Sequence, residues 1–390
     1  MSTFERTHPW LSFSLDLSHA PWQMWLLAGE SISKCEHLAG VALSPEVAAE
    51  LMKVYLAKGA LATTAIEGNT LTEQEARKRV EGIKDLPPSK AYLGVEIDNI
   101  IDASNRILAQ CKSHVVEELT PDLIKRFNAQ VLKNLALDAE IRPGEIRDYS
   151  VGVADYRGAP AADCDDLLRR LCEWLRQPWI TSLENYSPSD QRRLDAILKA
   201  IVAHLYLAWV HPFGDGNGRT ARLVEFYILA TGGVPFPAAH LLSNHYNETR
   251  SEYYRQLSMA SKSGGNVIPF IIYALRGFVD QLREQIQVIR DEQLDLFWRN
   301  HVHQVLGDSE TGRRRRYLVE DLTPLSSGVS KSKLTDISVR VLRHYMGRAE
   351  KTLQRDLDEL ERLKLVRREG DRYLANKDLV LAYLPPRRSE

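Results

Sequence analysis

The chain has 390 residues, 44% of them hydrophobic, which is enough for two or three domains with sizeable cores. Lys and Arg number 51 against 52 Asp and Glu, so the net charge of −1 gives no global attraction to nucleic acid or to a membrane surface. The four cysteines lack CxxC spacing, and neither a signal peptide nor a membrane-length apolar run is found, so we expect a reduced, cytoplasmic protein without membrane contact.

Helical patterns prevail in residues 1–115, which we expect to form an N-terminal helical region. Apolar spacing predicts helices over 47–66 and 93–108, with a break at Pro87-Pro88. The first of these helices ends in Thr-Thr-Ala-Ile-Glu-Gly-Asn, residues 63–69. Taken alone, Glu67 is typical of a solvated residue at a helix end, before a cap at Gly68.

The segment Arg-Pro-Gly-Glu-Ile-Arg at 142–147 is followed by the β-branched residues Val151 and Val153 around Gly152. This pattern predicts a short hairpin between helices. Such a hairpin can be a plain surface feature, or it can receive an extended segment of another protein by strand addition.

A helix is predicted after Ser187-Pro188, which supply an N-cap and a first-turn proline. Apolar residues then recur at helical spacing, and the helix should end near His211-Pro212, because the residue before a proline is pushed out of the α region. The next residues, 211–222, read His-Pro-Phe-Gly-Asp-Gly-Asn-Gly-Arg-Thr-Ala-Arg. A second helix is expected from Arg219.

The glycines of this turn predict an anion site. Gly214, Gly216 and Gly218 permit positive φ, and a turn of that kind aims successive backbone N–H groups at one point. Because the turn also leads into a helix N-terminus, its N–H groups and the helix dipole both favour an anion. Phosphate is the anion that the neighbouring side chains suit best.

Those side chains are of the types that phosphate transfer needs. Arg219 and Arg222 can hold phosphate oxygens, and Asp215 can take a Mg²⁺ that bridges two phosphates. His211 at the lip of the turn can accept a proton from an incoming hydroxyl. We interpret Phe213 as an apolar peg that fixes the loop to the core. Each residue alone is typical of an ordinary turn or helix, but together they predict a phosphate-handling site.

The segment 211–222 matches H-x-F-x-[DE]-G-N-G-R-x-x-R at every fixed position, and the chain therefore resembles Fic-domain proteins. The resemblance implies an α-helical bundle with a small β-hairpin flap, in which AMP passes from ATP to a Ser, Thr or Tyr hydroxyl of a protein and pyrophosphate is released. The implied site residues are the general base His211, the Mg²⁺ ligand Asp215, the α-phosphate cradle of Gly216, Asn217 and Gly218, the β-phosphate contact Arg219 and the γ-phosphate contact Arg222.

A second resemblance lies upstream. Thr63, Glu67 and Gly68 occupy the fixed places of the Fic autoinhibitory motif [ST]-x-x-x-E-[GN]. In the family this glutamate pairs with the second arginine of the signature, here Arg222. An Arg222 engaged by Glu67 cannot hold the γ-phosphate, so ATP would bind with its α-phosphate out of line for attack.

Further segments resemble the family between about residues 25 and 280. The R-P-G-x-x-R segment and the flap of Val151, Gly152 and Val153 stand where the family docks its target. Asn247, Tyr253 and Tyr254 stand where the family closes its adenine pocket, although aromatic residues at helical positions are also typical of a core. A long helix is expected around 269–296.

The last part of the chain differs in charge. Residues 300–390 contain 19 Lys and Arg against 14 Asp and Glu, whereas the first 299 residues contain 32 against 38. Arg313–Arg316 follow Gly307 and Gly312, which is typical of a linker or loop. A short helix around 334–342, a turn at 345–347, a helix over 349–363 and a hairpin over 366–374 then follow, which is the order of a winged-helix module.

For DNA binding, Lys351, Gln354 and Arg355 of the second helix would face the major groove, and arginines of the hairpin (Arg367, Arg368, Arg372) would contact phosphate. Four acidic residues on the same helix oppose this interpretation: Asp356, Asp358, Glu359 and Glu361. A protein-docking or dimerising module is the favoured alternative.

We therefore predict a mainly α protein with an N-terminal helical region (1–115), a Fic catalytic core (116–298) and a winged-helix domain (299–390). It is expected to be an adenylyltransferase that uses ATP and Mg²⁺, is autoinhibited through Glu67 and Arg222, and modifies an unidentified target protein or itself; a homodimer and DNA binding are left open. Two rival hypotheses are a transcriptional regulator with a nucleotide-sensing Fic site and a Fic enzyme that removes AMP. A Doc-like kinase is disfavoured because G-N-G-R is intact, and other nucleotide-derived donors stay open.

Overall fold

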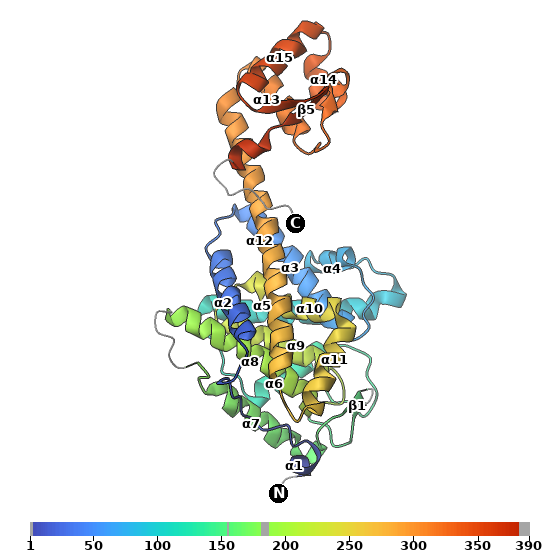
Figure 1. Cartoon of the computed structure of the whole chain (residues 1–390). Helices are drawn as coiled ribbons and strands as arrows, with labels where there is room; N and C mark the ends of the chain where they lie inside the picture. Colours follow the sequence, from blue (N-terminus) through green and yellow to red (C-terminus); the bar gives the residue numbers. More distant parts are fainter. Residues whose placement is uncertain (1–2, 154–155, 181–186, 382–390) are drawn as a thin grey trace. The chain divides into compact units, whose positions relative to one another are not determined.

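The computed structural model describes residues 3–153, 156–180 and 187–381 and is mainly helical (Figure 1). The chain divides into two compact units, Met1–Ile286 and Gln287–Glu390. No helix in the described ranges is both long enough and apolar enough to cross a membrane.

The first unit contains most of the helices and one two-stranded hairpin. Its helices are α1 (Thr3–Thr7), α2 (Trp22–Ala39), α3 (Pro45–Ala65), α4 (Glu73–Val80), α5 (Ala91–Ser113), α6 (Pro121–Val131), α7 (Cys164–Arg176), α8 (Pro188–Val210), α9 (Asn217–Thr231), α10 (Leu241–Glu248) and α11 (Arg250–Lys262). Its hairpin pairs β1 (Gly152–Val153) with β2 (Tyr156–Arg157). The helix α12 (Ile268–Leu306) belongs in sequence to both units.

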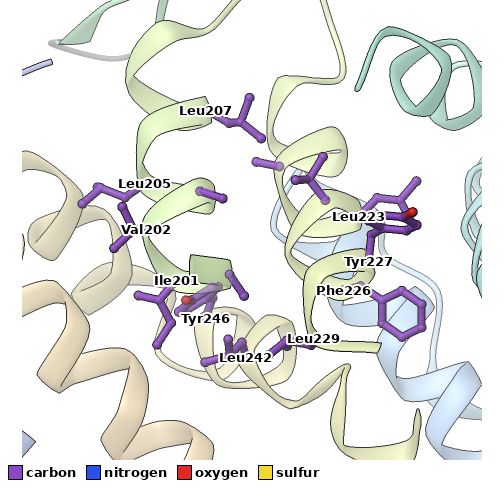
Figure 2. Packing of buried hydrophobic residues seen from close by; sticks show 14 of the residues in the cluster. Ile201, Val202, Leu205, Leu207, Leu223, Phe226, Tyr227, Leu229, Leu242 and Tyr246 are labelled. Atoms are coloured by element: carbon purple, nitrogen blue, oxygen red, sulfur yellow. The ribbon is translucent and has the colours of Figure 1, made fainter. Parts of the chain in front are cut away.

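Helices α8 and α9 form the centre of the first unit's core. Figure 2 shows Ile201, Val202, Leu205 and Leu207 of α8 and Leu223, Phe226, Tyr227 and Leu229 of α9 among the packed side chains, with Leu242 and Tyr246 of α10 beside them. Because both helices are buried over most of their length, the loop that joins them is held firmly at both ends. That loop is residues 211–216.

The ends of α8 and α9 follow from local sequence. Ser187 caps α8, since its hydroxyl accepts a hydrogen bond from the N–H of Asp190 at 3.2 Å. The helix ends at Val210, as predicted from the following His-Pro step. The predicted start of α9 at Arg219 is wrong by two residues, because Gly216 already supplies the left-handed N-cap, with a φ of 73°.

Helix α3 lies close against α10 because it carries a glycine at the contact. A Cβ on Gly59 would collide with the imidazole of His240. Ser44 caps the start of α3, accepting from Val47 N at 3.3 Å. The close contact brings the end of α3, and with it residues 63–68, beside the start of α9 (Figure 1).

The second unit has its own apolar core, which includes Trp298, Leu318, Leu357 and Tyr373. Three strands, β3 (Val329–Ser330), β5 (Arg372–Ala375) and β4 (Val366–Glu369), form a sheet in this order. Arg372 of β5 lies opposite Ser330 of β3 on one side and opposite Glu369 of β4 on the other. The elements are α13 (Glu310–Leu322), β3 (Val329–Ser330), η4 (Lys331–Asp336), α14 (Val339–Tyr345), α15 (Glu350–Arg362), β4 (Val366–Glu369) and β5 (Arg372–Ala375). The predicted hairpin over 366–374 and the predicted helix over 349–363 are therefore present.

The prediction of a linker at Arg313–Arg316 is wrong. These residues lie in α13, whose first turn is capped by Ser309 through a hydrogen bond from Gly312 N at 3.0 Å. Arg314 is buried because Asp356 accepts from its Nε at 2.7 Å, and Arg316 pairs with Asp308 at 2.8 Å. The partner of Arg314 and Arg315, Asp356, is about forty residues away in the sequence, so the local composition could not reveal these ion pairs.

Two further predicted elements differ in extent. The long helix continues beyond residue 296 to Leu306, because Trp298 and Val302 are buried in the second core. The single helix expected around 334–342 is two elements, η4 and α14, separated at Ser338. Ser338 caps α14 by accepting from Val341 N at 3.1 Å.

Candidate active site

His211 closes α8 in a left-handed conformation, with a φ of 49°. Its N–H donates to Leu207 O at 2.9 Å, and Pro212 after it disfavours the right-handed helical region. Histidine tolerates the left-handed region better than most residues. The helix end therefore turns the imidazole out of the α8 axis and into the cavity described below.

The loop after His211 is braced by Asn217. Its Oδ1 accepts from Phe213 N at 2.9 Å, and its Nδ2 donates to Phe213 O at 2.8 Å. Phe213 is buried in the core, as the peg interpretation expects. Both ends of the Asn217 amide are used inside the loop, so its side chain shapes the turn, and Gly216 N donates to Asp215 Oδ1 at 2.5 Å.

The start of α9 has the local chemistry that favours an anion. The first N–H groups of a helix have no partner within it, and the helix dipole adds a partial positive charge there. Arg219 and Arg222 lie on the first turns of α9, and their residues are 5% and 1% exposed. Burying two guanidinium groups beside one helix N-terminus requires nearby negative charge.

Glu67 supplies part of that charge. Its Oε1 accepts a hydrogen bond from Arg222 Nη2 at 2.5 Å, and it lies so close to Gly218 that a Cβ there would collide with it. Burial by itself raises the pKa of Glu67, but the charge and hydrogen bond of Arg222 outweigh burial and leave the pKa below its usual value. A protein carboxylate thus stands at the N-terminus of α9, where a phosphate would bind.

Thr63 takes part through its backbone. Its carbonyl oxygen accepts from Arg222 Nε at 3.2 Å and from Nη2 at 2.9 Å. The two contacts orient the guanidinium toward the end of α3. Gly68, the third residue of the motif, has a φ of 103°, which lets the chain turn away directly after Glu67.

Arg219 is held by two other carboxylates. Its Nη1 donates to Glu96 Oε1 at 2.8 Å, and its Nη2 lies 3.2 Å from Asp215 Oδ2. The Asp215 side chain is 41% exposed, so it can turn toward a cation. Magnesium uses one or two protein carboxylates and completes its shell with phosphate oxygens and water, and a single exposed Asp fits that pattern. Among the described residues no group of three or more His, Cys, Asp or Glu could hold a metal ion alone.

His211 has the protonation state that a general base needs. Burial lowers its pKa to about 4, and the charge of Arg147 acts in the same direction while Glu67 and Asp215 oppose it. The imidazole is therefore neutral at neutral pH and can accept a proton.

Arg147 ties the His211 loop to the hairpin segment. Its Nε donates to His211 O at 2.8 Å, its Nη1 to Tyr149 O at 2.5 Å and its Nη2 to Ala159 O at 2.6 Å. Gly158 lies in the same contact, since a Cβ there would be 2.9 Å from His211 Cβ. One buried guanidinium thus fixes the backbone on both sides of the imidazole.

A cavity of about 470 Å³ is lined by Glu67, His211, Gly218 and Arg222, whereas Asp215, Asn217 and Arg219 are not among its lining residues. Its lining combines predicted site residues with residues that the sequence did not single out: Ile66, Glu67, Tyr156, Ala208, Trp209, His211, Gly218, Arg222, Tyr253, Tyr254, Leu257, Ser258, Ser261 and Lys262. Tyr253 is buried and shares a hydrogen bond with His204 at 2.8 Å, whereas Tyr254 is 39% exposed. Asn247, predicted beside them, is not among the lining residues.

The hairpin lies at the cavity through Tyr156. Val153 pairs with Tyr156 and Gly152 with Arg157, while Val151 precedes β1. The Tyr156 hydroxyl donates to Trp209 O at 2.8 Å. The sequence did not identify Tyr156, Arg147 or Glu96 as site residues, because their partners are far away in the chain.

Comparison with known proteins finds Fic proteins. Residues 118–229 match the model of the Fic/DOC family. Over 215 residues, 55% of this chain, the sequence is 31% identical to the protein adenylyltransferase fic-1 of Caenorhabditis elegans and covers 38% of it. The protein adenylyltransferase Fic of Nematostella vectensis is 30% identical over 218 residues, 55% of this chain and 45% of that protein. The chain thus spans less than half of the length of these relatives.

Solved structures share the fold. A Fic family protein from Desulfovibrio desulfuricans G20 superposes with a TM-score of 0.54 at 18% identity, over 90% of this chain and 95% of that one. A structure of C. elegans Fic-1 gives a TM-score of 0.53 at 25% identity, over 69% of this chain and 73% of that one.

The Arg147 contacts lead to a first prediction. Replacing Arg147 by Ala leaves three carbonyl groups without their donor. Because each hydrogen bond to a charged group is worth about 1.5–3 kcal/mol, we expect the free energy of unfolding to fall by at least roughly 4 kcal/mol. Amide hydrogen exchange in residues 211–216 should become faster. Denaturant unfolding and exchange mass spectrometry of the full chain measure both effects.

The matched control is Arg142→Ala, which removes an exposed arginine of the same segment that pairs with Glu145 at 3.4 Å. It should change stability by less than about 0.5 kcal/mol. Equal effects of the two substitutions would mean that Arg147 does not brace the loop.

Proposed function

We propose that this protein transfers AMP from Mg-ATP to a hydroxyl group of Ser, Thr or Tyr on a target protein, and that Glu67 restrains the reaction. The observation that carries the proposal is the position of the Glu67 carboxylate, on Arg222 and at the N-terminus of α9, in the wall of the cavity that also contains His211. The names of the relatives above support the same chemistry.

The cavity suits a nucleotide. Its volume of about 470 Å³ lies within the range of small-molecule sites, and apolar and aromatic side chains make up part of its wall. We place the adenosine against Tyr254 and Leu257 and the phosphates toward α9. Arg219 then holds the β-phosphate and Arg222 the γ-phosphate, because the two arginines follow one another along the first turns of the helix.

In the proposed reaction, the hydroxyl oxygen of the target attacks the α-phosphorus while neutral His211 accepts its proton. The bond to the bridging oxygen breaks, and pyrophosphate leaves with the displaced charge, which Arg219 and Arg222 stabilise. Asp215 would hold Mg²⁺, which supplies further charge neutralisation on the phosphates. The hairpin segment around Val151, Gly152 and Tyr156 is the proposed place for the target chain beside His211.

Restraint follows from competition for one buried cation. Arg222 is 1% exposed, and its Nε and Nη2 already donate to Thr63 and Glu67, so these donors are not open to a γ-phosphate. The Glu67 carboxylate also repels the triphosphate. Misplacing the α-phosphate relative to the attacking oxygen removes the orientation on which the transfer rate depends.

Glu67→Gly tests this proposal. We expect AMP transfer to the protein itself or to target proteins in host lysate to rise at least about tenfold, which corresponds to roughly 1.4 kcal/mol of barrier. Labelled ATP with Mg²⁺ and intact-mass analysis provide the measurement. Adding His211→Ala to Glu67→Gly should abolish the label, because no base is left beside the hydroxyl.

Glu46→Gly is the matched control, since it removes an exposed glutamate from the other end of α3. It should leave transfer at the wild-type level. If Glu67→Gly and wild type label equally, or if pre-modified target loses AMP faster than it gains it, the proposed restraint or the proposed direction of the reaction is wrong.

A second candidate function concerns the second unit, and one observation favours it. Asp356, which counted against DNA binding, is buried with Arg314 and Arg315 and is therefore absent from the exposed face of α15. A cavity of about 660 Å³ at the start of α15 is lined by Lys331, Arg348 and Arg368, together with Glu350 and Asp371. We propose that α14, α15 and the β4–β5 hairpin form a winged-helix module that binds duplex DNA.

The double substitution Lys351→Ala and Arg355→Ala tests DNA binding. Both side chains are exposed on α15, and losing two phosphate or base contacts should weaken binding to a random-sequence duplex at least about fivefold. Gel shift at rising salt is the measurement, and wild-type binding should weaken as salt increases. Arg362→Ala, an exposed arginine of the same helix that pairs with Glu359, is the control. If the wild-type protein does not bind the duplex even at low salt, the DNA-binding proposal is wrong and a protein-docking role is favoured for this unit.

A further inference from the structure

Glu96 of α5 contacts the first arginine of the phosphate site. Its Oε1 accepts from Arg219 Nη1 at 2.8 Å, and its side chain is 16% exposed. Asp215, on the other side of the same guanidinium, is 41% exposed. Arg219 therefore has an inner edge fixed to α5 by Glu96 and an outer edge that faces Asp215.

The second oxygen of Glu96 extends the network toward Glu67. Asn69 Nδ2 donates to Glu96 Oε2 at 2.8 Å and to Leu93 O at 3.0 Å, while Asn69 Oδ1 accepts from Leu71 N at 3.1 Å. Glu96 thus uses one oxygen for Arg219 and the other for the turn that follows Glu67. Both contacts come from residues that are buried, since Asn69 and Arg219 are 6% and 5% exposed.

We propose that Glu96 is a positioning residue for phosphate binding: it fixes the inner edge of Arg219 so that the outer edge is presented to the β-phosphate of a bound nucleotide. The inference rests on the proposed nucleotide site. The Nε of Arg219 is buried and has no hydrogen-bond partner among the described residues, so an arriving phosphate oxygen satisfies a donor that is otherwise costly to bury. When Asp215 turns to a cation, Nη2 becomes available to the same phosphate.

Glu96 differs in this from Glu67, although both are glutamates on buried arginines. Glu67 lines the cavity and stands at the N-terminus of α9, so it competes with phosphate. Neither Glu96 nor Arg219 is among the lining residues, and Glu96 approaches Arg219 from α5. Removing Glu67 should therefore strengthen phosphate binding, whereas removing Glu96 should weaken it.

Glu96→Gln tests the proposal with little change in size. The glutamine amide places an NH₂ group against either the guanidinium of Arg219 or the amide of Asn69, both of which are donors. We expect the Kd for Mg-ADP to rise about tenfold while the Kd for AMP, which has no β-phosphate, stays the same. Isothermal titration calorimetry on the full chain measures both constants. The Kd of Glu96→Asp for Mg-ADP should lie between those of wild type and Glu96→Gln, because aspartate keeps the charge.

Asp98→Asn is the matched control, because it breaks an ion pair of the same helix with Arg79 that does not reach the site. It should leave both constants unchanged even if thermal melting shows a loss of stability. Equal changes for ADP and AMP, no change for ADP, or tighter ADP binding in Glu96→Gln would overturn the role of Glu96. If wild type binds neither nucleotide, both the proposed nucleotide site and this inference are wrong. If Glu96→Gln loses affinity for ADP alone but the protein transfers no AMP, only the proposed activity is wrong.

Discussion

The burial of the Arg222 guanidinium is the constraint on which the site depends. A cation with 1% exposure needs a compensating negative charge, and the N-terminus of α9 beside it attracts the same charge. Only an anion at this one place can satisfy both requirements. In this structure the anion is the Glu67 carboxylate, which occupies the place proposed for a phosphate.

The position of Glu67 depends on packing far from the site. Gly59 lets α3 lie against His240, the N-cap residue of α10, and Asn69 fastens the turn after Glu67 to α5. Arg147 fixes the opposite wall by holding the backbone on both sides of His211. The His211 loop, Glu67 and the hairpin are therefore held by separate contacts, so the network allows Glu67 to be replaced without dismantling the His211 loop.

Local chemistry made much of this predictable from the sequence. The end of α8 follows from the His-Pro step, the turn from its glycines, and the α15 helix and the hairpin after it from apolar spacing and a glycine turn. Residues whose partners are distant in sequence could not be found in this way. In the sequence, Glu96 resembles a solvated helix residue, Asp356 resembles a surface acid, and Arg313–Arg316 resemble a linker. Only folding brings their partners to them. Periodicity likewise could not reveal that α12 continues to Leu306.

The central claim is that Glu67 and a γ-phosphate compete for Arg222, and the contribution of the γ-phosphate to binding measures this directly. Calorimetry would compare the Kd of a non-hydrolysable ATP analogue with that of ADP, both with Mg²⁺, in wild type and in Glu67→Gly. We predict nearly equal constants in wild type and about tenfold tighter binding of the triphosphate in Glu67→Gly, where Arg222 is free to hold it. The same ratio of the two constants in both proteins would contradict the account, because Arg222 would then not be the shared partner.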